Sequence, residues 1–329
     1  MKQEVILGDQ INLTFERHVS CLILHSEYHD SDSGADYISL LKDLLFQRGF
    51  NVRFLTVEAS SNGVFSGNFE AAAADCHLGI ILIDSMRDDV LYHYGYLKGI
   101  GKPVINLGMG GQQNGSKSSS KLYDLGYTEL YGDESHSFKN TDEILSDALN
   151  ETLPQLAGNF TRDCIKHMRF DDPESQTDLE SIARDLFECY SGSAEYDYGK
   201  ADELSRRLKS WEQTSGKETP VKILDLLASI YVRLAESGKI ERSGLESKVY
   251  AGLIELYSTM LEHASDLQAE NTLRMKLADV YMITVWEGAS CEDNAVEKAL
   301  ALYEKSLEFY TPEAYPEQYS TLCFRLGSI

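Results

Sequence analysis

Short apolar runs alternate with amphipathic stretches through the first half of the chain. The runs are brief, nearly continuous and bounded by polar residues, which is typical of buried parallel strands. They predict five strands, at residues 19–25, 51–57, 78–84, 103–107 and 129–131. Between the first two strands, leucines at helical spacing around Leu40–Leu45 predict a helix that ends at Gly49. The pattern therefore predicts an α/β domain in which helices cover a parallel sheet.

The pattern changes near Gly158, where the alternation of strands stops. An amphipathic helix over 142–156, with Thr141 as its N-cap, is expected to close a first domain of residues 1–157. From residue 158 to residue 329, helical periods are separated by short polar breaks. We therefore predict a second domain, 158–329, made only of helices.

The last helical pair resembles a tetratricopeptide (TPR) repeat. Residues 294–309 form an Ala/Leu/Tyr helix, and the segment from Thr311 to Ile329 adds a Pro-containing turn and a helix that ends in Leu-Gly. The earlier helices match that pattern only by their period. The resemblance implies an array of helical hairpins that binds a protein partner.

The composition of the chain limits the kinds of partner that we expect. The net charge of -23 is shared by both halves and would repel nucleic acid and anionic lipid. The six cysteines form no CxxC pair, and no metal site is expected. They are expected to be reduced core residues, and the N-terminus lacks the apolar core of a signal peptide. We expect a cytoplasmic protein with no membrane or nucleic-acid partner.

Residues 88–107 join a Gly-punctuated helix to a short strand and follow the apolar run that ends at Asp84. Ligands of open parallel sheets bind at the carboxyl ends of the strands. The polar segment 108–121 is expected to form a mobile loop over those ends. Residues after the first and third strands are therefore candidate ligand contacts: Ser26, Glu27, Asp84, Ser85 and Asp89.

Three motifs in this half resemble the TIR-like and nucleoside deoxyribosyltransferase-like group of nucleotide-binding domains. Residues 90–96 (VLYHYGY) are similar to the group's N-V-x-Y-E-x-G-Y segment, and residues 101–105 match G-K-P-V-I. Residues 69–76 resemble the helix before the third strand, with Glu70 at a position that often faces the ligand. The resemblance covers about the first 150 residues. It implies a flavodoxin-like or TIR-like sheet that takes NAD or a nucleotide as ligand or substrate.

The chain departs from this group at one position. The group's catalytic Glu, which stabilises the ribosyl cation as an N-glycosidic bond breaks, falls on His93. An imidazole offers no permanent negative charge, which puts glycosidase chemistry in doubt. Glu27 and Asp84, together with Asp88 and Asp89, are the nearby acids that could replace it. The catalytic residue therefore stays unassigned.

Several candidates also have structural explanations. Tyr92 and Tyr96 share a helix face and could pack the helix onto the sheet, whereas His93 takes the position expected to face the crevice. Gly95 could serve close helix packing or the approach of a ligand ring. Ser33 and Gly34 could present N–H groups to an anion or belong to a capping loop.

Three functions follow. The first is a bacterial signalling or antiviral defence protein, whose TIR-like domain binds a nucleotide-type ligand or forms homo-oligomers while the repeats recruit a partner. The second is an NAD or nucleoside N-glycosidase that oligomerisation or partner binding activates. The third is a scaffold with a degenerate pocket.

Overall fold

The computed structural model divides into two compact units. The sheet unit comprises Arg17–Asp171 and Ala183–Ala194, and the helical unit comprises Met1–Glu16, Asp172–Ile182 and Glu195–Ile329. The structure describes residues 13, 16–26, 32–57, 67–83, 88–108, 127–129, 139–191, 197–237, 244–289 and 294–329. An α/β part followed by a helical part is thus confirmed.

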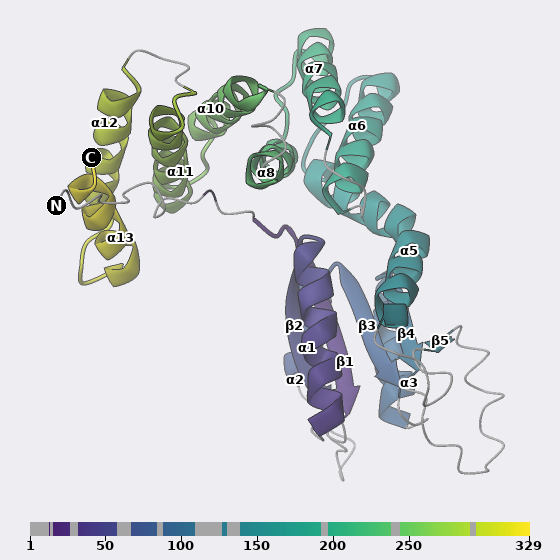
Figure 1. Ribbon diagram of the computed structural model, residues 1–329. Helices are drawn as coiled ribbons and strands as arrows, with labels where there is room; N and C mark the ends of the chain where they lie inside the picture. The colour runs from purple at the N-terminus through teal and green to yellow at the C-terminus, as the bar shows by residue number, and fades with distance from the viewer. Residues whose placement is uncertain are drawn as a thin grey trace. The chain divides into compact units, whose positions relative to one another are not determined.

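The sheet has five strands in the described part of the chain, all parallel, in the order β2-β1-β3-β4-β5. Figure 1 shows these strands between their covering helices. Their bounds are β1 Val19–Ser26, β2 Phe50–Val57, β3 Leu78–Ile83, β4 Val104–Gly108 and β5 Tyr127–Glu129. Strands β1 and β3 pair at the centre, where Ile23 lies opposite Ile80.

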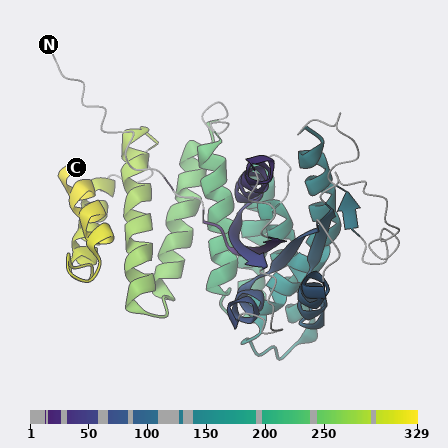
Figure 2. The same cartoon turned by 90° about the horizontal axis from the view of Figure 1, so that it is seen from below.

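Helices cover both faces of this sheet. Helix α1 (Asp32–Gln47) lies on one face, and α2 (Gly67–Asp75) and α3 (Asp88–Gly99) lie on the other (Figure 2). Alternate residues of a strand point to opposite faces, so Leu22 and Leu24 of β1 turn to the second face. There they join a buried cluster with Phe69 and Leu97. Both faces are therefore apolar, as the continuous apolar runs predict.

The amino-terminal edge of the sheet is held by a tyrosine from a distant helix. Tyr190 lies near the end of α6 (Pro173–Ser191) and is fully buried. Its hydroxyl donates a hydrogen bond to the carbonyl of Gly49 at 2.7 Å and accepts one from the backbone N–H of His18 at 3.0 Å. Gly49 has φ +84, and an added Cβ would lie 2.7 Å from the Tyr190 ring. One side chain thus ties the starts of β1 and β2 to α6.

The fifth strand, the closing helix and one cysteine differ from the sequence predictions. Strand β5 begins two residues earlier than the predicted 129–131. Helix α5 spans Lys139–Ile165, so it neither ends at Leu156 nor begins at an N-cap Thr141. It continues past Pro154 because its apolar stripe stays buried through Phe160 and Ile165.

Five cysteines are free thiols, and they differ in how far they are buried. Cys21, Cys76 and Cys164 are buried, whereas Cys323 is exposed and was wrongly expected to be a core residue. The sixth, Cys291, lies outside the described residues.

The helical unit is a succession of helices that contact their neighbours in chain order (Figures 1 and 2). Their bounds are α7 Tyr198–Ser215, α8 Val221–Glu236, α10 Glu246–Glu262, α11 Leu267–Trp286, α12 Ala295–Leu307 and α13 Pro316–Gly327. The final pair predicted from the sequence is present as α12 and α13, with Pro316 in the first turn of α13. Among the described residues, no helix combines the length and apolar character needed to cross a membrane.

A buried ion pair fastens the last helix to this succession. Arg325 of α13 contacts Asp279 of α11 at 2.9 Å, and the Tyr303 hydroxyl of α12 donates to the same carboxylate at 2.5 Å. Leu322 is the one residue of α13 that is buried. Burial raises the pKa of Asp279 to about 6, although the Arg325 charge and the Tyr303 hydrogen bond oppose that rise.

Replacing Gly49 should destabilise the sheet unit more than replacing a glycine that has space around it. Gly49→Ala adds a Cβ against Tyr190 and forces alanine into the left-handed region, whose cost is about 1–2 kcal/mol before the clash. Gly99→Ala is the matched control, because nothing lies within 4 Å of its added Cβ. Hydrogen exchange of the β1 and β2 amides should accelerate in Gly49→Ala only. Equal exchange in both variants would contradict the role of Tyr190.

The stability of the helical unit should depend on pH through Asp279. Its folded-state pKa of about 6 exceeds the ordinary 3.8, so the folded state holds the proton more tightly. The contribution to the free energy of unfolding is therefore complete below about pH 4 and is lost as the pH rises through about 6. Relative to Asp279→Asn, the unmodified chain should lose on the order of 2–3 kcal/mol across this range. Urea unfolding followed by Trp211 and Trp286 fluorescence measures this loss of unfolding free energy. If the unfolding free energies of the unmodified chain and of Asp279→Asn changed in parallel with pH, the prediction would be contradicted.

Candidate functional site

The strand order creates a switch point at the carboxyl edge of the sheet. From β1 the chain passes through α1 to β2 on one side, and from β3 it passes through α3 to β4 on the other. The chain therefore continues from β1 and from β3 to opposite sides of the sheet, and ligands of open α/β sheets bind at such a point. This is the edge that the sequence predicts for a ligand.

The predicted ligand contacts lie at this edge or outside the described residues. Ser26 is the last residue of β1, and Asp89 lies in the first turn of α3. Ser33 and Gly34 lie in the first turn of α1. Glu27, Asp84, Ser85 and residues 109–121 of the predicted mobile loop lie outside the described residues.

An aromatic cluster, Phe69, Tyr92, His93 and Tyr96, joins α2 to α3 near that edge. Phe69 comes from the first turns of α2, directly after the β2 connection, and the other three come from α3, which follows β3. The His93 ring meets Phe69 edge-on, with the two centroids 4.2 Å apart and the planes at 89°. The ring centroid of Tyr96 lies 5.3 Å from that of Phe69 and 6.1 Å from that of Tyr92. Two motifs that are separate in the sequence are thus in contact.

His93 is packed inside this cluster. Only 5% of its surface is exposed, whereas Tyr92 and Tyr96 are half-buried and pack against the core below them. The packing role that the i, i+4 spacing predicts for the tyrosines is therefore present. A neutral imidazole suits such a place better than a carboxylate, because an ionised acid would need a compensating partner there.

Glu70 brings a carboxylate to the cluster. Its side chain is exposed, and it accepts a hydrogen bond from the Tyr92 hydroxyl. Partial burial raises the pKa of Tyr92, and the negative charge of Glu70 raises it further. Tyr92 therefore stays a neutral donor at physiological pH. The arrangement offers aromatic surface beside one carboxylate, which suits stacking and hydrogen bonding to hydroxyl groups.

The G-K-P-V-I motif has a structural use in this fold. Gly101 has φ +77 and ends α3 in a Schellman motif, in which its N–H bonds to the Lys98 carbonyl and the Lys102 N–H bonds to that of Leu97. The ammonium of Lys102 donates to the carbonyls of Ala74 (2.9 Å) and Cys76 (2.6 Å), at the end of α2. The motif therefore connects α2 to α3 at the amino edge, away from the strand ends where a ligand is expected.

Gly95 does not provide the close helix packing that the sequence suggested. It is exposed, and an added Cβ would meet nothing within 4 Å. The close approach of α3 to the sheet occurs at Gly79, where a Cβ would lie 2.7 Å from the Leu97 side chain. No local pattern singles out Gly79, because its partner Leu97 is distant along the chain.

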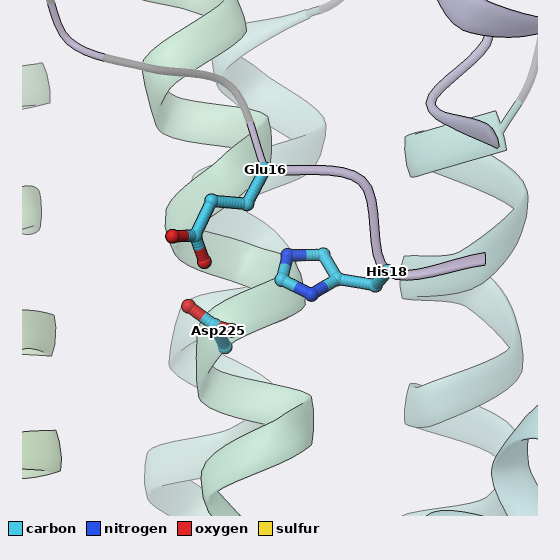
Figure 3. A group of neighbouring side chains, drawn as sticks. All are labelled: Glu16, His18 and Asp225. Atoms are coloured by element: carbon cyan, nitrogen blue, oxygen red, sulfur yellow. The ribbon is translucent and has the colours of Figure 1, made fainter. Parts of the chain in front are cut away.

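A second polar cluster lies in the helical unit. Lys276 of α11 contacts Glu16 at 2.8 Å and Asp225 of α8 at 3.7 Å. Figure 3 shows the carboxylates of Glu16 and Asp225 turned toward one another. The sequence patterns did not predict this cluster. No local pattern signals a pair that joins the first residues of the chain to its last third.

Comparison of the sequence with protein-family models and with curated proteins finds no match. The TIR-like and TPR-like resemblances therefore rest on the motifs of this chain alone.

Lys102 should matter for stability and not for ligand binding. Lys102→Met removes two charge-assisted hydrogen bonds to the end of α2 and should cost the sheet unit about 1–2 kcal/mol. Lys98→Met is the matched control, because that ammonium is exposed and lies 5.8 Å from the Tyr94 ring. Thermal unfolding of both variants measures the difference. A control as destabilised as Lys102→Met would contradict this assignment.

Proposed function

We propose that the sheet unit binds NAD or another nucleotide-type ligand at its carboxyl edge and that the helical unit binds a protein partner. The protein would then be a cytoplasmic signalling or antiviral defence protein, in which a TIR-like unit reports the ligand or self-associates and TPR-like helices recruit the partner. The observation that carries this proposal is the aromatic cluster with Glu70, at the edge where the strand order has its switch point.

The cluster fits the parts of a nucleoside. The half-buried rings of Tyr92 and Tyr96 suit stacking of a base, which depends on π-faces and not on one hydrogen-bond pattern. The exposed carboxylate of Glu70 suits a ribose diol, whose two hydroxyls are hydrogen-bond donors. Asp89 and the end of β1 at Ser26 lie at the same edge.

Binding is favoured over cleavage because of His93. The position that resembles the family's catalytic Glu is a buried imidazole edge-on to Phe69. The described carboxylate beside the cluster is that of Glu70 on α2, which accepts a hydrogen bond from the Tyr92 hydroxyl. It is therefore placed to hold hydroxyls. We expect the chain to bind NAD or a nucleoside without releasing nicotinamide or free base.

Calorimetry of the full chain with NAD and with nucleosides tests the binding proposal. Glu70→Gln should weaken the affinity about tenfold, because it removes a charge-assisted hydrogen bond worth roughly 1.5 kcal/mol. Asp75→Asn is the matched control, since Asp75 is an exposed acid at the other end of the same helix. Absence of binding at millimolar ligand would favour the scaffold. Equal affinities for both variants would show that Glu70 does not contact the ligand.

The same samples decide between binding and hydrolysis. Incubation with NAD and with nucleosides, before and after forced oligomerisation, should release neither nicotinamide nor base, as chromatography would show. Measurable release would favour the N-glycosidase instead.

A further inference from the structure

Glu16, ahead of the first strand, contacts helix α11 of the helical unit through its carboxylate. Glu16 belongs to a non-helical segment, and its Oε1 lies 2.8 Å from the Nζ of Lys276 on α11. The two residues are far apart in sequence, with the five strands of the sheet and eight described helices between them. The contact is therefore a tertiary interaction that fixes the end of this segment on the helices.

The place that Glu16 occupies is built by three helices. Asp225 of α8 reaches the same ammonium at 3.7 Å, and the ring of Tyr257 of α10 lies 5.6 Å from it. Tyr257 is buried, so most of its ring is covered by neighbouring residues. Burial raises the pKa of Tyr257, and the charges of Asp225 and Glu16 raise it further. The hydroxyl thus stays neutral beside the two carboxylates.

The two carboxylates differ in how firmly they are attached. Asp225 is fixed within a helix, and its side chain is 22% exposed. Glu16 lies outside any helix or strand, and its side chain is 37% exposed. Lys276 itself is 21% exposed, so a carboxylate can reach it from solvent. A half-exposed ion pair contributes little free energy and can exchange with another carboxylate of the same chemistry.

We propose that the surface around Lys276, Asp225 and Tyr257 is a docking surface for an extended acidic protein segment and that Glu16 is its resident occupant. A partner segment would place its carboxylate on Lys276 and displace Glu16. This inference rests on the proposed partner binding by the helical unit and is independent of nucleotide binding by the sheet unit. Aliphatic and aromatic parts of such a segment would cover the Tyr257 ring.

Charge exchange tests whether the Glu16 contact exists in solution. Hydrogen exchange around residues 13–16 should accelerate about two- to fivefold in Glu16→Lys and in Lys276→Glu, and the double variant should restore it. Lys209→Glu is the control, because it breaks an exposed pair with Glu255 elsewhere on the unit. Unchanged exchange in both single variants would overturn the proposal, and so would a double variant no slower than the singles.

A peptide in trans tests whether the surface accepts an external segment. A fluorescent peptide of residues 9–18 should bind the full-length Glu16→Gln chain about threefold more tightly than the unmodified chain, because the resident carboxylate is gone. Binding should weaken when the peptide carries Glu16→Gln or the chain carries Lys276→Met. A peptide that does not bind, or that binds regardless of Lys276, would overturn the docking surface. NAD affinity, measured on the same variants, should not change, which separates this failure from failure of nucleotide binding.

Discussion

The Tyr190 hydroxyl, placed between the His18 N–H and the Gly49 carbonyl, is the contact on which the organisation of the sheet unit depends. A buried backbone N–H or carbonyl is costly when it has no partner, and this hydroxyl satisfies one of each. It does so at the starts of β1 and β2, so the second half of α6 lies at the amino edge of the sheet. The strand ends at the carboxyl edge, where we propose that a ligand binds, are not used by this contact.

Other polar contacts of the sheet unit follow the same division between edges. Lys102 ties α2 to the segment before β4, and Ser20 bonds to His77 before β3, both at the amino edge. Near the carboxyl edge the described residues instead place aromatic rings, a buried imidazole and one exposed carboxylate. Stability and proposed ligand binding thus use opposite edges, as is usual for parallel α/β sheets.

The strands and most helices could be predicted because each carries its own periodicity. Helix α1 ends before Gly49, and α12 and α13 form the expected last pair, since caps and apolar stripes are local signals. Helix α5 was misjudged because its continuation past Pro154 depends on burial of Phe160 and Ile165 and not on propensity. The burial of His93 against Phe69 and the contact of Lys276 with Glu16 were missed for another reason: each joins residues distant in sequence.

The central claim, that a nucleotide-type ligand binds at the carboxyl edge between β1 and β3, is tested most directly by hydrogen exchange of the full chain with and without saturating NAD or nucleoside. The account predicts slower exchange in the segments that directly follow these two strands and in the first turns of α3, with no change in the amides next to Gly49 and Tyr190. Protection confined to the amino edge or to the helical unit would contradict it.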